Sequence, residues 1–281
     1  MTQNNEIQLF PNGAPGETAT LKEKESPYNI KIGGLSVRIL TNVSEPTITF
    51  YPAPEENNTG VTMVVCPGGG YKVLAYDLEG TEVCQLFNSY GINCVLLKYR
   101  VPRRKGLKKH EPPLQDLQRA IAYTRSHAAE WNIDENKIGV IGFSAGAHLV
   151  AVASNASDEL SYLPVDQIDE MSVRPDFALV IYPGYLAADN FRVASEIKVS
   201  ENTCPTFIVQ TQDDHDWIDS SLFYYYALKQ AKVSVTMHLY PRGYHGYGVR
   251  NTGRLVNEWP ERALGWLNEM KIIRNKKPLQ D

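Results

Sequence analysis

Residues 137–150 read Lys-Ile-Gly-Val-Ile-Gly-Phe-Ser-Ala-Gly-Ala-His-Leu-Val and carry the strongest structural signal in the chain. An apolar, β-rich run ends in Gly-x-Ser-x-Gly around Ser144, and a helix-forming run follows at once. So sharp a turn leaves no room for side chains on either side of the serine, and Gly142 and Gly146 avoid that Cβ clash. The pattern is typical of a nucleophile elbow, which exposes the serine hydroxyl at the top of a sheet.

Strands and helices alternate on both sides of this elbow. Two weak strands come first, at 35–40 and 47–51. The continuous apolar runs that predict buried strands are 61–66, 92–98, 177–182 and 206–211, with a further strand at 233–240. The segments that predict helices are 79–90, 113–129, 220–231 and 258–271. This order predicts an α/β fold with a mostly parallel, doubly wound sheet and helices on both faces.

The 281 residues are enough for one large α/β domain, and no repeat or linker interrupts them. Residues 1–30 are polar, with Pro and Gly, and predict an irregular N-terminal arm. Residues 31–281 are predicted to form a single domain. The polar segments 155–176 and 183–203 are interpreted as a surface excursion and a long insertion.

Charge and composition exclude several classes of function. The net charge of −4 argues against nucleic acid as a partner, because nucleic-acid binding needs a basic face. The densest basic stretch, 100–109, is interpreted as a solvated loop before a helix. No apolar run approaches the roughly 18 residues that span a bilayer, so no membrane partner is expected.

The cysteines and the N-terminal residues indicate the cytoplasm. The four cysteines form no CxxC pair and imply no disulfide framework, which favours a reducing compartment. The first residues, MTQNNEIQLFPNG, have neither a basic start nor an apolar core, so no signal peptide is predicted. The sequence leaves open whether the chain forms a homo-oligomer.

A nucleophilic serine needs a base to take its proton and an acid to hold that base. His245 follows the strand at 233–240 in a loop with glycines on both sides, and it is the predicted base. Asp213 and Asp214 follow the preceding strand, and either gives the chain order Ser, Asp, His. We choose Asp214 as the acid. The alternative is Asp213, whose expected role is capping or hydrogen bonding in a turn.

A glycine run after the strand at 61–66 predicts an oxyanion loop. The run lets backbone N–H groups face a cavity, and Gly69 and Gly70 are the chosen donors, with the Ala145 N–H as the third. The run lacks the Gly-Lys-Ser/Thr ending of a phosphate loop. The histidines show no HExxH or comparable spacing, and His148 is interpreted as a buried, hydrogen-bonded residue. No metal and no cofactor are therefore expected.

Five strings together resemble a known group of enzymes. They are Pro67–Tyr71, Lys98–Pro102, Pro113–Ala120, Gly142–His148 and Gly243–Gly246. The chain resembles bacterial esterases near the hormone-sensitive-lipase branch of the α/β-hydrolases. More narrowly, it is similar to the acetyl-esterase and xylan-esterase-like enzymes that are often labelled sugar hydrolases. The resemblance covers roughly residues 35–270 and implies an α/β-hydrolase fold.

By this resemblance, Ser144, Asp214 and His245 form the triad, and Gly69, Gly70 and Ala145 form the oxyanion hole. In the related run His-Gly-x-x-Asp-x-x-Val the acid lies four residues past the histidine, whose position is Gln210 here, and this favours Asp214. The chain departs from the pattern in three places. Pro67 stands where the lipase branch has His, Ala147 where related sugar esterases often have Gly, and Asp-Asp-His-Asp-Trp where they tend to have Asp-Asp followed by Pro and Val.

The predicted function is hydrolysis of short-chain, acetyl esters of sugars or xylo-oligosaccharides by a serine carboxylesterase. The segments 155–176 and 183–203 are too polar to form an apolar lid for long acyl chains. Aromatic faces with polar tips suit sugar rings, and the residues chosen to bind substrate are Tyr71, Tyr182, Trp217 and Tyr244. Ordinary loop packing is the other interpretation of these aromatics. Two other functions stay open, a small serine peptidase of the same fold and a non-enzymatic binding protein on a hydrolase scaffold.

Overall fold

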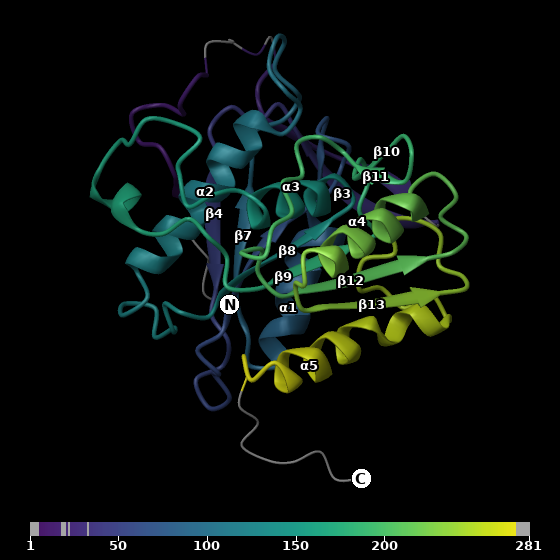
Figure 1. The fold of residues 1–281 in the computed structure, drawn as a ribbon. Helices are drawn as coiled ribbons and strands as arrows, with labels where there is room; N and C mark the ends of the chain where they lie inside the picture. The colour runs from purple at the N-terminus through teal and green to yellow at the C-terminus, as the bar shows by residue number, and fades with distance from the viewer. Residues whose placement is uncertain (1–5, 18–20, 22, 33, 274–281) are drawn as a thin grey trace.

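The computed structural model describes residues 6–17, 21, 23–32 and 34–273. Within them a central sheet runs through the molecule in the order β1-β4-β7-β5-β8-β9-β12-β13 (Figure 1). Its strands are β1 (Glu6–Gln8), β4 (Thr47–Tyr51), β7 (Asn93–Lys98), β5 (Thr62–Cys66), β8 (Ile138–Phe143), β9 (Ala178–Ile181), β12 (Thr206–Thr211) and β13 (Val235–Tyr240). The pairs β1–β4 and β4–β7 are antiparallel, and the other neighbours are parallel. The mostly parallel sheet is thus confirmed.

Helices cover both faces of this sheet (Figure 1). They are α1 (Glu82–Ser89), α2 (Glu111–Ser126), α3 (Ala145–Ser154), α4 (Ile218–Gln230) and α5 (Trp259–Glu269), and a π-helical turn at Asp77–Thr81 leads into α1. α1 and α5 share one face, where the rings of Phe87 and Trp259 lie 6.0 Å apart. α2, α3 and α4 lie on the other face. No helix in the described part of the chain is long and apolar enough to cross a bilayer.

Five central strands of the sheet are apolar and fully enclosed. Every residue of β5, β7, β8, β9 and β12 is buried, as the continuous apolar runs predict for strands covered on both faces. β5, β8, β12 and β13 run parallel, so their carboxyl ends meet at one edge of the sheet. In such sheets this edge is where ligands bind.

The prediction of a wholly irregular N-terminal arm is wrong for the part that the structure describes. β1 pairs with β4 at the edge of the central sheet, and β2 (Ser26–Ile32) pairs with β3 (Leu35–Thr41). β3 also pairs with β6 (Leu74–Ala75), which makes a separate three-stranded sheet. Strand β2 is exposed along nearly all of its length, so it lacks the apolar pattern of a buried strand. Pairing with β3 stabilises it instead. The division of the chain into one domain stays a prediction.

The interpretation of 100–109 as a solvated loop is also wrong in part. Arg100 is only 2% exposed, and its guanidinium contacts the buried Asp116 at 2.8 Å. Arg104, 7% exposed, contacts Glu17 at 2.7 Å. Buried charges need such partners, because an unpaired charge loses its hydration without compensation. These two arginines therefore hold the N-terminal segment and α2 against the sheet.

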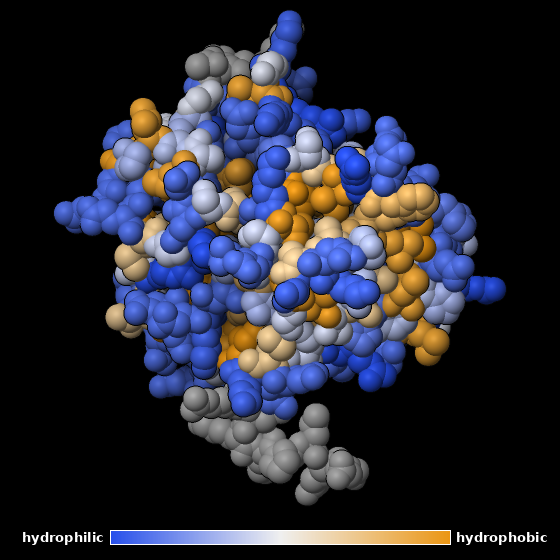
Figure 2. Space-filling view, viewed as in Figure 1, coloured by the Kyte–Doolittle hydropathy of each residue, from blue (hydrophilic) through white to orange (hydrophobic). Residues whose placement is uncertain are grey.

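The segment after β9 carries a short hairpin. It pairs β10 (Ala187–Ala188) with β11 (Arg192–Val193), inside the predicted insertion. The hairpin packs on α4, where the rings of Phe191 and Phe223 lie 5.4 Å apart. Figure 2 shows hydrophobic surface gathered near this region on a face that is otherwise largely hydrophilic.

Candidate active site

Ser144 sits at the turn between β8 and α3. Its backbone angles, a φ of 53° and a ψ of −115°, lie outside the φ/ψ regions that residues other than glycine normally adopt. Such backbone strain is typical of functional positions. A Cβ at Gly142 would lie 2.2 Å from the Gly146 carbonyl oxygen, and a Cβ at Gly146 would lie 2.1 Å from that of Cys66. The predicted need for glycine on both sides of Ser144 is therefore confirmed.

Three predicted side chains meet in a row at the carboxyl edge of the sheet. Ser144 follows β8, Asp214 follows β12 and His245 follows β13. The Ser144 Oγ lies 2.7 Å from His245 Nε2, and His245 Nδ1 lies 2.7 Å from Asp214 Oδ2. The side chain of Asp214 is 4% exposed and that of His245 is 31% exposed. The carboxylate is thus shielded from solvent, while the imidazole and the hydroxyl remain accessible.

The neighbouring Asp213 points into the loop that carries the histidine. It accepts hydrogen bonds from the backbone N–H groups of Gly243 at 2.9 Å and Tyr244 at 2.8 Å. Although burial favours its neutral form, these N–H groups hold the pKa of Asp213 below its usual value, and Arg254 adds to the effect at 3.6 Å. Asp213 therefore anchors this loop, and Asp214 is the carboxylate in contact with His245.

The glycine loop after β5 lies against the serine. A Cβ at Gly68 would come within 2.8 Å of the Ser144 Cβ. Gly69 and Gly70 have φ values of 132° and 65°, and among the described residues neither backbone N–H has a hydrogen-bond acceptor. Ala145 is the first residue of α3, so its N–H has no acceptor within the helix. These are the three N–H groups that the sequence predicts as the oxyanion hole, and that role stays a prediction.

A buried carboxylate that the sequence did not reveal lies behind this loop. Glu79 is 3% exposed and accepts hydrogen bonds from the Gly68 N–H at 2.7 Å and the Tyr182 hydroxyl at 2.9 Å. The Tyr182 ring packs edge-on against His245 at 5.0 Å, and its hydroxyl accepts from the Gly248 N–H at 3.0 Å. Burial raises the pKa of Glu79 above its ordinary value. The only sequence signal is an acidic residue at the buried start of a helix.

We expect Glu79→Gln to lower kcat about tenfold with little change in KM. The amide nitrogen cannot accept one of the two hydrogen bonds, so either Gly68 or Tyr182 loses its acceptor and the glycine loop or the histidine shifts. The unsatisfied group also costs about 1–3 kcal/mol of unfolding free energy. Steady-state kinetics and thermal unfolding measure both effects. Glu130→Gln, at an exposed site, is the matched control. A wild-type kcat in Glu79→Gln would contradict this positioning role.

The predicted substrate-binding aromatics fall into two groups. Tyr71 and Tyr182 are 1% and 0% exposed, and the Tyr71 hydroxyl lies 2.8 Å from His148 Nδ1. Neither lies on an exposed rim, because both hydroxyls are engaged inside the protein, and that part of the prediction is corrected. Trp217 is partly exposed with its ring 6.4 Å from that of His245. Tyr244 is 60% exposed, so these two remain the accessible aromatics near the histidine.

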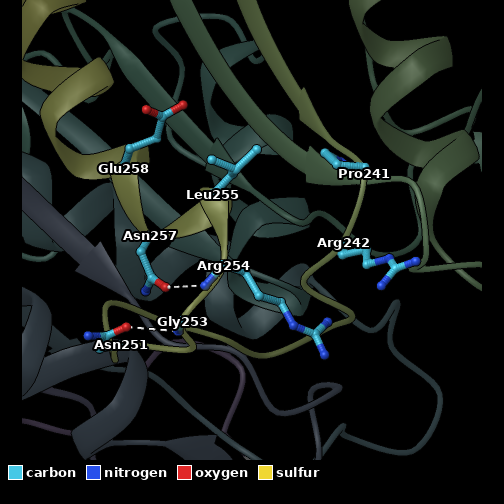
Figure 3. A pocket seen from close by; sticks show the side chains of 8 residues that line it. All are labelled: Pro241, Arg242, Asn251, Gly253, Arg254, Leu255, Asn257 and Glu258. Atoms are coloured by element: carbon cyan, nitrogen blue, oxygen red, sulfur yellow. Dashed lines mark hydrogen bonds between the residues drawn. The ribbon is translucent and has the colours of Figure 1, made fainter.

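Two cavities adjoin at the loop that carries His245. The first, of about 550 Å³, is lined by His245, Tyr244 and Tyr247 together with Ile32 and Leu35 from the three-stranded sheet. The second, of about 560 Å³, lies beside it and shares two lining residues with it, but His245 does not line it. Figure 3 shows the second cavity, with the arginine side chains extended along one side of it. The first cavity therefore reaches the predicted base, and neither Ser144 nor the glycine loop is among the residues that line it.

The chain is similar to several known proteins. The BD-FAE family model matches residues 49–179. The acetylxylan esterase of Xylanibacter ruminicola is 28% identical over 79% of this chain and 48% of its own length. Endo-1,4-beta-xylanase B of Butyrivibrio fibrisolvens is 31% identical over 67% of this chain and 33% of its own length. The crystal structure of an acetyl ester-xyloside bifunctional hydrolase from Caldicellulosiruptor lactoaceticus superposes with a TM-score of 0.74 at 27% identity, over 96% of this chain and 98% of that chain.

The chain has the α/β-hydrolase fold. The similarity to acetylxylan esterase and acetyl ester-xyloside hydrolase confirms the predicted resemblance to the acetyl-esterase and xylan-esterase-like group. The chain spans about half or less of the length of the two curated relatives.

Proposed function

We propose that this α/β-hydrolase is a serine carboxylesterase that removes acetyl groups from sugars or xylo-oligosaccharides. The observation that carries the proposal is the continuous hydrogen-bonded row of Ser144, His245 and Asp214, with distances of 2.7 Å at both contacts. This is the arrangement in which a base activates a serine and a carboxylate orients the base. The names of its relatives, acetylxylan esterase and acetyl ester-xyloside hydrolase, support the substrate class.

The proposed mechanism is a two-step acyl transfer. His245 takes the proton of Ser144 as the Oγ attacks the ester carbonyl, and the N–H groups of Gly69, Gly70 and Ala145 stabilise the oxyanion. His245 then gives this proton to the leaving alcohol, and an acetyl-serine forms. Water, activated by the same imidazole, hydrolyses the acyl-enzyme and returns the proton to the serine. Asp214 keeps the imidazole in the tautomer that carries its proton on Nδ1.

Accessible aromatic side chains near His245 support a carbohydrate as the alcohol. Trp217 packs edge-on against Tyr185 at 4.8 Å, and an aromatic pair of this kind provides a surface for a sugar ring. Tyr244 stands exposed in the loop next to His245. The free, buried cysteines support a reducing compartment, and we place the enzyme in the cytoplasm.

The test is acetate release from 4-nitrophenyl acetate and from acetylated xylo-oligosaccharides. We expect release from both, and slow hydrolysis of a 4-nitrophenyl decanoate. Comparable rates on acetyl and decanoyl esters would contradict the proposed preference for short acyl groups. Faster cleavage of an aminoacyl amide than of the acetyl ester would indicate a peptidase. Failure to react with a fluorophosphonate probe would indicate a binding protein.

A further inference from the structure

A second cluster of chemically reactive side chains lies outside the proposed active site. His110 precedes α2, His148 lies on α3 one turn after Ser144, and Glu196 lies in the insertion after β11. One ligand atom from each of these three residues lies within 4.8 Å of the others. The expectation of no metal site was based on spacing along the chain, and the fold brings together residues that are far apart in sequence.

One ring nitrogen of His148 faces Glu196, and the other has a hydrogen-bond partner, as is usual for a metal-binding histidine. His148 Nε2 lies 3.3 Å from Glu196 Oε1. Two ligands on a tetrahedral Zn²⁺ are about 3.3 Å apart when each bond is about 2.0 Å long. The other ring nitrogen, Nδ1, lies 2.8 Å from the Tyr71 hydroxyl, and such a partner fixes the tautomer and the ring orientation of a metal-bound histidine.

His110 supplies the second, independent observation. It is 7% exposed, and its Nδ1 is buried with no hydrogen-bond partner among the described residues. Buried polar atoms are normally paired, so an unpaired imidazole nitrogen beside another histidine calls for an explanation. The rings of His110 and His148 lie 5.6 Å apart. A cavity of about 900 Å³ is lined by His110 and Glu196, and it gives solvent access to an open coordination position.

The ammonium group of Lys109 places a positive charge beside Glu196. Its Nζ lies 2.9 Å from the same Glu196 Oε1 that faces His148, and its side chain is 24% exposed. The long, partly exposed stem lets the ammonium swing away into the adjoining cavity, which Lys109 itself lines. The carboxylate then becomes available to another cation.

We propose that His110, His148 and Glu196 bind a divalent transition-metal ion, with Zn²⁺ the preferred ion and water in the fourth position. Two imidazoles and one carboxylate with an open position are a ligand set that Zn²⁺ takes in proteins. The ion displaces the Lys109 ammonium and links three segments of the chain: the N-terminus of α2, the first turn of α3 and the insertion. This site is separate from the Ser144 row and does not depend on the proposed esterase activity.

The test is Zn²⁺ binding by calorimetry, with Co²⁺ absorption as a spectroscopic check of tetrahedral geometry. All proteins carry His245→Ala, because His245 and Asp214 could themselves bind added metal. We expect one ion per chain and a rise in the thermal midpoint of about 5 °C at a hundredfold excess over Kd. His110→Ala and Glu196→Gln should each weaken binding at least tenfold. His127→Ala, at the other end of α2, is the matched control and should bind normally.

A variant of the competing lysine sharpens the outcome. Lys109→Gln removes the charge beside Glu196 and should tighten Zn²⁺ binding by up to about fivefold. Binding that is equal in the parent His245→Ala protein and in its His110→Ala and Glu196→Gln derivatives would show metal held elsewhere on the chain and would overturn the proposal. Absence of binding at millimolar Zn²⁺ would overturn it as well.

Discussion

Ser144→Ala should lower kcat/KM for 4-nitrophenyl acetate by at least about 10³-fold. Loss of a nucleophilic serine removes the acyl-enzyme route, and what then remains is the contribution of the oxyanion donors and of binding. Alanine keeps the Cβ, so the turn with its φ of 53° is not altered by the change. The measurement is the initial rate of 4-nitrophenol release together with labelling by a fluorophosphonate probe, which should be lost completely.

The control for this variant lies on the helix that follows Ser144. Ser154→Ala removes a buried hydroxyl at the far end of α3, and it should retain close to wild-type activity. Equal thermal midpoints of Ser144→Ala and the wild-type protein would show that the fold is intact. A Ser144→Ala protein that keeps full activity would contradict the proposed nucleophile, and with it the esterase mechanism.

Asp214→Asn should lower kcat by about 10⁴-fold. Asp213→Asn should lower kcat by about tenfold or less. The Asp214 carboxylate lies 2.7 Å from His245 Nδ1, and an amide that donates its own proton there stabilises the wrong tautomer. Asp213 instead accepts hydrogen bonds from the backbone N–H groups of Gly243 and Tyr244 at the same oxygen, Oδ1, and an asparagine oxygen at that position can still accept both.

The two aspartate variants test each other, because they make the same chemical change at adjacent positions. The kcat for 4-nitrophenyl acetate and the thermal midpoint are measured for both. Asp214→Asn should fold with a midpoint near that of the wild type, so that its loss of rate is a chemical effect. If Asp213→Asn loses the greater part of kcat and Asp214→Asn does not, the assignment of the acid is wrong.

Local signals in the sequence were sufficient for much of the fold. The strands predicted at 47–51 and 206–211 have those bounds in the structure, because each is a short β-rich run that ends at a turn. The elbow around Ser144 could also be predicted, since the clash that requires Gly142 and Gly146 arises within a few residues along the chain. Local signals did not predict β1 and β2, because these strands are stabilised by pairing with other strands of the chain.

Local sequence patterns could not predict which aromatic side chains point into the core. Tyr71 and Tyr182 have the composition of an aromatic rim, yet both are buried, because their hydroxyls find partners in His148 and Glu79 across the core. Glu79 itself looks like an ordinary acidic residue at the start of a helix. Its place behind the glycine loop depends on a tyrosine that is distant in sequence.

The sequence by itself determined the alternation of strands and helices, the sharp turn at Ser144 and the chain order of serine, aspartate and histidine. These depend on apolar periodicity and on backbone sterics, which act over a few neighbouring residues. Only the tertiary structure decided that Asp214 rather than Asp213 contacts His245, and that His110, His148 and Glu196 meet. Such contacts join segments far apart in the chain, so they depend on how the whole sheet and its helices pack and not on any local pattern.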